Sequence, residues 1–447
     1  MDARLAALRD RLSQSRDCRP RVCGKLVRVV GLTLEATGLQ VPIGSYCQVE
    51  AGEPDGLVEA EVVGFANDRL YLMPVGAVRG LRPGAKVIPV GHAGEVRVGR
   101  SLLGRVMGGA GGLIDGGSDP ILNHRIPLLG EPINPLNRRL ITEPMDIGIR
   151  AINALFTLGR GQRIGLFAGS GVGKSTLLGL MTRFSDADVV VVGLIGERGR
   201  EVQEFINEIL GPQGLARAIV VAAPADDSPL TRLHGAWRAT ALAEYFRGQG
   251  LNVLLLMDSL TRVAQAQREI ALAIGEPPVT KGYPPSVFTL LPRLVERTGN
   301  LGANGSITAI YTVLVEGDDL MDPIADTARA ILDGHISLSR EIAEGGRYPA
   351  IDIANSVSRV TSRLLDSSQR EQIMRFKALY SVYQQNRDLI NIGAYTPGSN
   401  AQIDQAVIAH PRLEEFLRQG ENEKVTLDQS NNQMRGLMGA LAQGSPV

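Results

Sequence analysis

The segment GLFAGSGVGKST, from Gly165 to Thr176, constrains the fold of this chain more than any other stretch. Its apolar start is typical of a buried strand, and glycines at 169, 171 and 173 break that strand before a lysine and two hydroxyl residues. Glycines in such a loop let backbone N–H groups turn toward phosphate oxygens, while the following helix directs the positive end of its dipole at them. The segment predicts a phosphate-binding loop between a strand and a helix.

Individual residues of the loop have separate expected roles. Lys174 would reach the β- and γ-phosphates of a nucleotide, and the hydroxyl of Ser175 would ligate Mg²⁺, with Thr176 the less suitable ligand by position. The generic pattern has glycine where this chain has Ala168, which an ordinary backbone angle would tolerate. Every residue of the loop is a candidate nucleotide contact: Gly169, Ser170, Gly171, Val172, Gly173, Lys174, Ser175 and Thr176.

The loop lies within a pattern of apolar runs that alternate with helical segments. Near-continuous apolar runs are expected for a parallel sheet that helices cover on both faces. The sequence therefore predicts an α/β fold with a P-loop, RecA-like core. The expected strands are Arg163–Ala168, Val189–Ile195, Ala218–Ala222, Asn252–Met257 and Ser306–Val315.

Two acidic residues follow expected strands of this core. Asp258 ends the run NVLLLMD, where a P-loop protein needs a carboxylate to organise Mg²⁺ and its waters. Glu197 is the candidate base that orients and polarises the attacking water, although its spacing equally allows a solvated loop glutamate. Arg198 and Glu201 are candidate supporting residues that would hold the loop by pairing, with plain surface charge as the alternative.

The segments on both sides of the core differ from it in composition. From Arg21 to about His92, short β-branched runs between turn residues predict a small β-domain, which we expect to be a barrel. Residues 96–150 are rich in turn formers and predict a long connection, and beyond Asp366 the apolar spacing becomes helical. The expected domains are an arm at 1–20, a β-barrel at 21–92, an ATPase domain at 93–365 and a C-terminal helical domain at 366–447.

The N-terminal arm has an amphipathic pattern. Leu5, Leu8 and Leu12 share one side of the expected helix, and its arginines lie largely elsewhere. The pattern fits a terminus that frays or docks on its own chain as well as it fits a partner-binding or membrane-surface arm.

Composition narrows the classes of partner. Lys plus Arg equals Asp plus Glu, at 47 each, so no sequence-wide positive field exists to gather nucleic acid or anionic lipid. Aromatic residues make up 4%, which offers little for stacking single strands and disfavours an RNA or DNA translocase. The longest apolar runs fall far below the ~20 residues of a membrane-spanning helix, and the N-terminus lacks the apolar stretch of a signal peptide. We therefore expect a cytoplasmic protein.

Several motifs, in order along the chain, resemble the type III protein-export ATPases, relatives of rotary ATP synthase subunits that drive flagellar and injectisome secretion. These motifs are AGSGVGKST, GERGREVQEF, LLLMDSLTR, AIGEPPVTKGYPPSVF, EGDDLMDPIADTARAILDGHISLSR and YPAIDIANSVSR. The resemblance covers roughly residues 20–440. The segments PINPLNRR and VVAAPADDSPL favour the flagellar branch, the flagellum-specific export ATPases, over the injectisome branch.

The resemblance supports the phosphate, Mg²⁺ and base roles above, and it implies four roles that spacing leaves open. Arg198 and Arg262 fall on arginines that line the γ-phosphate side of the pocket in rotary-ATPase catalytic subunits. Tyr348 falls where the family packs an aromatic ring against adenine, and Arg359 where it supplies an arginine finger across a subunit boundary. Without the resemblance, Tyr348 would be interpreted as a core tyrosine and Arg359 as a surface arginine.

The resemblance also implies an assembly with partners. The family forms homohexamers that hydrolyse ATP with Mg²⁺ between neighbouring cores, with barrels at one end of the ring and helical domains at the other. Hydrolysis would release and unfold exported proteins at a membrane export gate, on the inner face of the cytoplasmic membrane. The arm would bind a dimeric export-regulator protein, and the C-terminal helices would meet a coiled-coil stalk and export chaperones, with no nucleic-acid partner.

Two alternatives share this core. An injectisome ATPase would serve another secretion system, and a non-catalytic subunit of a rotary complex would use its nucleotide structurally. Such subunits typically carry glutamine where this chain has Glu197. The carboxylate and the finger together favour an active homo-oligomer.

Overall fold

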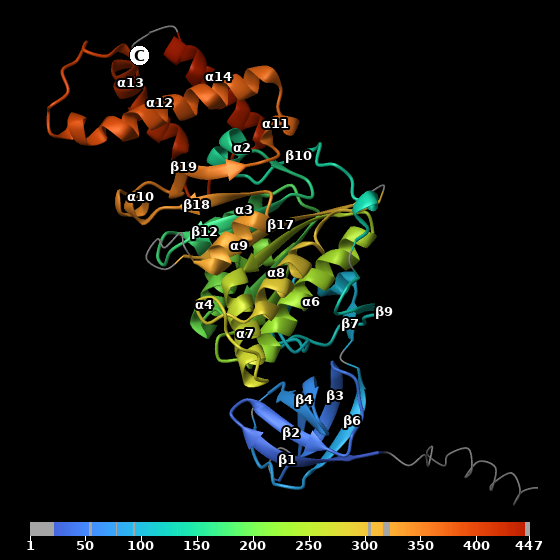
Figure 1. Ribbon diagram of the computed structural model, residues 1–447. Coiled ribbons are helices and arrows are strands. Elements are labelled where there is room, and N and C mark those ends of the chain that lie inside the picture. The colour runs from blue at the N-terminus through green and yellow to red at the C-terminus, as the bar shows by residue number, and fades with distance from the viewer. Residues whose placement is uncertain are drawn as a thin grey trace, which may run out of the picture. The chain divides into compact units, whose positions relative to one another are not determined.

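The computed structural model describes residues 22–52, 56–76, 78–92, 94–131, 133–302, 305–315 and 322–442 (Figure 1). The arm expected at 1–20 lies outside these ranges, as do residues 316–321 of the motif that begins EGDDLMD. The chain divides into two compact units, Met1–Ala93 and Gly94–Val447.

The first unit contains the closed β-barrel that the sequence predicts. Leu26, Cys47 and Leu72 are among the apolar side chains that fill its interior. No apolar run marks β2 and β3 in the sequence, because TLEAT and SYCQVE mix polar residues with apolar ones. In pairing order, the strands are β1 (Gly24–Val30), β2 (Thr33–Thr37), β5 (Arg69–Pro74), β4 (Leu57–Ala66), β3 (Ser45–Glu50) and β6 (Lys86–His92).

The second unit is built on a mostly parallel sheet. The strands expected from the apolar runs are all present, and each hydrogen-bonded pair among them is parallel. Their carboxyl ends therefore meet at one edge of the sheet, where sites of α/β proteins form. In order across the sheet, the strands are β19 (Ile351–Ser358), β18 (Gly334–Leu338), β12 (Arg163–Ala168), β17 (Ser306–Leu314), β15 (Asn252–Asp258), β13 (Val189–Ile195), β14 (Ala218–Ala223) and β8 (Val106–Gly108), and β16 (Gly299–Asn300) also pairs with β17.

The expectation of a long connection over residues 96–150 is only partly correct, because the segment contains several short strands. This segment contains β8, which pairs in parallel with β14 and extends the sheet. The strand is short and turn residues follow it, so no apolar run marks it in the sequence. The carbonyl oxygens of Gly109 and Ala110 accept bonds from the Arg238 guanidinium at 3.2 and 3.0 Å, which ties the glycine-rich stretch to the neighbouring helix α6 (Pro229–Gly248).

Helices cover both faces of the sheet. In Figure 1, α6, α7 (Leu260–Ala273), α8 (Pro285–Val295) and α9 (Pro323–Ile331) lie in front of it. On the other face, strand residues such as Leu166, Val192 and Leu256 join α3 (Lys174–Phe184) in one continuous core. Burial on both sides explains why these strands are apolar at almost every position.

The helical C-terminal region shares this core. Helix α12 (Ser367–Asn391) begins at a capping box in which Asp366 and Gln369 bond each other's backbone N–H groups. Phe376 of α12 contacts Phe416 of α13 (Ala401–Leu417), with ring centroids 5.6 Å apart. Met434, on α14 (Leu427–Ala442), belongs to the same cluster of buried residues as the strands.

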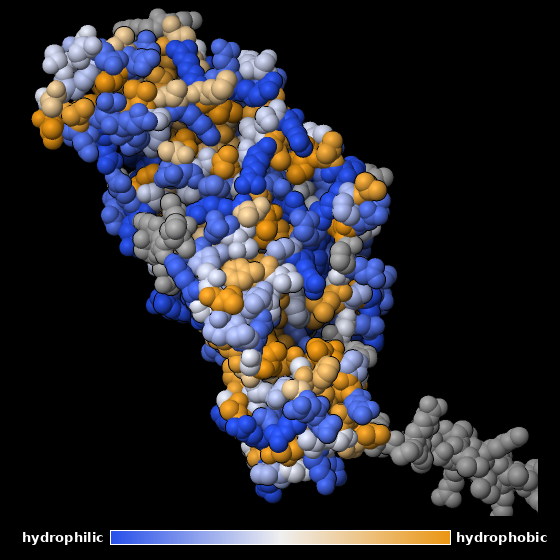
Figure 2. All heavy atoms as spheres, viewed as in Figure 1, coloured by the Kyte–Doolittle hydropathy of each residue, from blue (hydrophilic) through white to orange (hydrophobic). Residues whose placement is uncertain are grey.

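Short helices and strands complete the second unit. None of the helices in the described ranges combines the length and apolarity needed to cross a bilayer. Figure 2 shows polar and apolar side chains interspersed on the visible face of each unit. The remaining elements are β7 (Glu95–Val98), η1 (Arg100–Leu102), β9 (His124–Pro127), η2 (Pro135–Asn137), β10 (Pro144–Met145), α2 (Arg150–Leu155), β11 (Leu158–Gly159), α4 (Gly199–Glu204), η3 (Phe205–Leu210), α5 (Gly211–Ala216), α10 (Arg340–Glu344) and α11 (Thr361–Leu364).

Candidate active site

The glycine-rich loop turns between the end of β12 and the start of α3. Gly171 and Gly173 have φ angles of +78° and +82°, a left-handed conformation that side chains disfavour. Val172 between them is buried and anchors the loop. Ala168 has no positive φ angle, so its methyl group is compatible with the backbone at the first position of the motif. The loop has the geometry of a phosphate cradle at a helix N-terminus.

Lys174 joins the two carboxylates that the sequence analysis singled out. Its Nζ lies 2.6 Å from Oδ1 of Asp258 and 3.1 Å from Oε1 of Glu197. The three side chains come from α3, from the end of β15 and from the loop after β13, so the parallel sheet brings them to its carboxyl edge. The side chains of Lys174 and Glu197 are 12% and 16% exposed, and a charge so desolvated needs a partner.

Thr312 is a member of this cluster that the sequence analysis missed. Its hydroxyl donates to Oδ1 of Asp258 at 2.6 Å, and Asp258 is only 3% exposed. Thr312 lies inside the apolar strand β17, next to β15 in the sheet, and no local pattern marks it. Lys174 and Thr312 together fix the orientation of the buried carboxylate.

The surroundings of Glu197 change its acidity. Burial and the nearby charge of Asp258 raise its pKa to about 7, against an opposing effect of Lys174. For Lys174, burial lowers the pKa, but the attraction of Asp258 and Glu197 outweighs burial, and its pKa is raised overall. A carboxyl group that exchanges its proton near neutral pH suits a general base.

The raised pKa predicts how the nucleotide-free chain responds to pH. Ionised Glu197 lowers the free energy of unfolding progressively as the pH rises from about 4.5 toward 7, by about 3 kcal/mol in total. Glu197→Gln is neutral at every pH, so this variant should melt several degrees above wild type at pH 8 and close to it at pH 5. Thermal melts of the nucleotide-free proteins measure the difference. Glu204→Gln, which replaces an exposed glutamate on α4, is the matched control and should show no difference in melting temperature from wild type. Equal shifts in both variants would contradict the prediction.

Arg198 and Arg262 are placed differently from each other. The Arg198 side chain is 79% exposed and pairs with Glu201 at 3.2 Å, so the structure does not bring it to Lys174. Arg262 lies at the start of α7 against Gly196, where an added Cβ would come 2.7 Å from the Arg262 Cβ. Gly196, with φ of +72°, is therefore required for the path of the loop that carries Glu197. The Arg262 guanidinium donates to Gln265 at 2.8 Å.

Tyr348 lies against the phosphate loop. A Cβ on Gly173 would be 3.3 Å from the ring of Tyr348, and the Tyr348 side chain is 46% exposed, which excludes a core tyrosine. The Tyr348 carbonyl accepts a bond from the backbone of Gln419 at 3.0 Å. Arg340, which the sequence analysis did not single out, donates to the carbonyl of Ser170 at 3.4 Å. An exposed ring beside the loop could stack on a flat base.

Arg359 lies far from the loop of its own chain. β12 and β18 run parallel, and β19 returns antiparallel, so Arg359, just after β19, reaches the amino-terminal edge of β12. Its backbone N–H donates to the carbonyl of Asp333 at 3.0 Å, at the level of Arg163. The five steps from Arg163 to Ala168 span roughly 17 Å at about 3.3 Å each. Arg359 is exposed and cannot reach the phosphate loop of the same chain.

Comparisons with known proteins agree with this geometry. The model of the ATP synthase alpha/beta family nucleotide-binding domain matches residues 148–358, its beta-barrel domain matches 26–91, and the T3SS EscN ATPase C-terminal domain matches 365–436. The flagellum-specific ATP synthase of Pseudomonas aeruginosa is 58% identical over 94% of both chains. A solved structure of the assembled ATPase EscN from the type III secretion system of enteropathogenic E. coli is 42% identical, with a TM-score of 0.88. A second structure shows EscN in complex with its central stalk EscO, at 41% identity and a TM-score of 0.85. Each match covers 93% of this chain and 99% of the solved chain.

Fold and site together define an ATPase with a phosphate-binding loop and an ATP synthase alpha/beta nucleotide-binding domain. The chain belongs to the family of flagellum-specific ATP synthases and type III secretion ATPases. The expected fold class, with its barrel, parallel-sheet core and helical C-terminal region, is confirmed.

Proposed function

We propose that this ATPase works as a homohexameric ring whose Mg²⁺-dependent hydrolysis of ATP powers export of flagellar proteins, by releasing them from chaperones and unfolding them at the export gate. One observation carries the ring: Lys174, Asp258 and Glu197 gather at one edge of the sheet, while Arg359 lies at the opposite edge. If Arg359 acts on a γ-phosphate, that phosphate is bound by another chain. Rotational symmetry then gives every site one loop and one finger.

The residues of the site support a division of roles in hydrolysis. Lys174 binds the β- and γ-phosphate oxygens, and the backbone of the loop surrounds them. Glu197 orients the attacking water and holds its proton, for which a pKa near neutrality is suited. Arg262 lines the γ-phosphate side, and Arg198 reaches it after leaving its ion pair with Glu201. Tyr348 stacks on adenine from its place beside the loop.

The cofactor that this chemistry implies is Mg²⁺. The hydroxyl of Ser175 and the carboxylate of Asp258 are oxygen donors of the kind that Mg²⁺ prefers, and such sites hold the ion through one or two protein groups plus phosphate oxygens. In the part of the chain that the structure describes, no group of three or more His, Cys, Asp or Glu side chains is arranged to hold a metal by itself. When bound, the ion neutralises charge on the phosphates. Asp258 is already oriented for it by Thr312.

The partners follow from the relatives. EscN has been solved both as an assembled ATPase and in complex with its central stalk EscO, which supports a ring and a coiled-coil stalk partner for this chain. We further propose that the arm at 1–20 binds a dimeric export regulator. The barrel at 21–92 and the core at 93–365 form the ring, and the helical domain at 366–447 meets the stalk and export chaperones. The ring would associate peripherally with the inner face of the cytoplasmic membrane, without nucleic acid.

The alternatives are weaker on particular observations. A non-catalytic subunit has no need of a carboxylate base, yet Glu197 is held beside Lys174 at 3.1 Å. The flagellum-specific relative favours flagellar export over an injectisome, because it is 58% identical whereas the type 3 secretion system ATPase of Xanthomonas euvesicatoria is 49% identical.

Mixing two inactive variants tests the shared site. Lys174→Ala chains keep the finger and lose the phosphate lysine, whereas Arg359→Ala chains keep the lysine and lose the finger. If sites lie between chains, an equimolar mixture should recover activity at about a quarter of its interfaces, because that fraction pairs the two intact halves. ATPase rates of each variant and of the mixture, with ring formation followed by light scattering, make the measurement. A mixture that assembles into rings but stays as inactive as its parts would overturn the proposal.

A further inference from the structure

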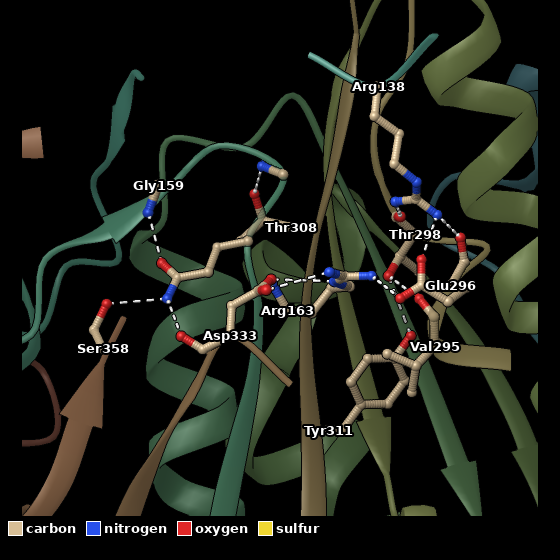
Figure 3. A network of polar contacts seen from close by, with 12 residues as sticks. Arg138, Gly159, Arg163, Val295, Glu296, Thr298, Thr308, Tyr311, Asp333 and Ser358 are labelled. Carbon is tan, nitrogen blue, oxygen red and sulfur yellow. Dashed lines mark hydrogen bonds and ion pairs between the residues drawn. The ribbon is translucent and has the colours of Figure 1, made fainter. Parts of the chain in front are cut away.

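A polar network holds together the amino-terminal edge of the sheet, opposite the phosphate loop (Figure 3). We propose that Asp333, Arg163 and Gln162 are positioning residues for Arg359. The strand that carries the phosphate loop of one chain would then also fix the arginine that this chain presents to its neighbour. The inference rests on the proposed role of Arg359 at the neighbouring site.

Asp333 connects β12 to Arg359 through both its side chain and its backbone. Its carboxylate accepts from the backbone N–H of Arg163 at 3.0 Å and from the Arg163 guanidinium at 3.1 and 3.2 Å. Its main-chain carbonyl accepts from the backbone N–H of Arg359 at 3.0 Å. A shift of the Asp333 carboxylate would therefore move the point where the backbone of Arg359 is attached.

Gln162 ties down the residue that precedes the finger. Its side chain is fully buried, and its Nε2 donates to the hydroxyl of Ser358 at 3.0 Å and to the carbonyl of Asp333 at 3.3 Å. Its Oε1 accepts from the backbone of Gly159 at 2.9 Å. In Figure 3, Ser358 lies on one side of Asp333 and Arg163 on the other.

Arg163 is itself fixed from two sides. Besides Asp333, Glu296 pairs with its guanidinium at 2.6 Å, and Arg138 pairs with Glu296 at 2.7 Å. The Arg163 side chain is 17% exposed, and bonds to two carboxylates hold its planar group in one orientation. The guanidinium of Arg359, in contrast, is exposed and donates to the carbonyl of Arg329 at 3.0 Å. The network thus holds the backbone of the finger and leaves its charged end at the surface.

Asp333→Asn tests the inference, because it keeps the side-chain volume and removes the charge that holds Arg163. We expect kcat to fall about tenfold to a hundredfold, since a displacement near 1 Å of a catalytic group can cost about that much. Binding of a fluorescent ATP analogue and ring formation should stay within twofold of wild type, because the phosphate loop is untouched. Ser358→Ala removes only the hydroxyl that Gln162 bonds. It should also lower kcat, by a smaller factor than Asp333→Asn.

The double variant Asp333→Asn with Arg359→Ala separates positioning from general stability. If Asp333 acts through Arg359, the double variant is no slower than Arg359→Ala alone. Asp186→Asn is the matched control: it breaks an ion pair with Arg160 at 2.6 Å near the same strand and should leave kcat unchanged. Additive losses in the double variant, or full activity of Asp333→Asn beside an inactive Arg359→Ala, overturn the inference. Full activity of Arg359→Ala would instead refute the proposed role of Arg359 itself.

Discussion

Replacing Glu197 with glutamine is expected to lower kcat by about 10²–10⁴-fold while the chain still binds ATP. The variant loses the group that takes the proton of the attacking water. It keeps an amide oxygen that can accept from Lys174, where the carboxylate oxygen now lies 3.1 Å from Nζ. Steady-state turnover and titration with a fluorescent ATP analogue measure the two effects separately. A kcat within tenfold of wild type would remove Glu197 from the mechanism.

The pH profile gives the same variant a second readout. In wild type, kcat/KM should rise with pH, pass its half-maximal value near pH 7 and level off above about pH 8, because the pKa of Glu197 is raised to about 7 by burial and by the charge of Asp258. The residual activity of Glu197→Gln should lack this limb. Glu204→Gln, which replaces an exposed glutamate on α4, is the control and should keep both the wild-type rate and the wild-type limb.

Local patterns were enough to predict the centre of the fold. The runs at Arg163–Ala168 and Val189–Ile195 became β12 and β13 with the same ends, because strands buried on both faces leave a continuous apolar signal. The strands that escaped prediction are short or half polar: β8 spans Val106–Gly108, and β19 follows the burial pattern of an edge strand with exposed residues in its middle. Their pairing depends on neighbours distant in sequence rather than on their own composition.

The residues of the site also divide into those that local patterns predict and those that they do not. Lys174, Asp258 and Glu197 were predictable, since each directly follows a strand or loop with a recognisable pattern, and parallel strands bring their carboxyl ends together. Thr312 was not, because its position opposite Asp258 follows from the register between β15 and β17. Arg198 shows the converse: its motif predicts a place at the γ-phosphate, and the structure gives it an ion pair with Glu201 at the surface. Side-chain direction at a loop depends on contacts that the sequence does not encode locally.

The Asp333 network gives the opposite edge of the sheet a function of its own. Sites in open α/β sheets form where strands end, so the edge where they begin is ordinarily structural. In this chain β12 begins at Arg163 and ends before the phosphate loop. The backbone of Arg359 bonds to Asp333, which in turn bonds to Arg163. A ring makes such an edge functional, because it faces the site of the next chain in the proposed assembly.

Arg359→Ala should abolish turnover more completely than any other substitution of a surface residue, with a fall in kcat of about 10³-fold or more. Within the described ranges, the exposed guanidinium makes one hydrogen bond, to the carbonyl of Arg329. Its loss therefore removes little from the fold. Nucleotide affinity and melting temperature should therefore stay near wild type. Arg359→Lys, which keeps the charge without the planar fork, should recover part of the rate. ATPase assays at protein concentrations above and below ring assembly provide the measurement. A diluted, single-chain wild type that turns over at the full rate would contradict the shared site.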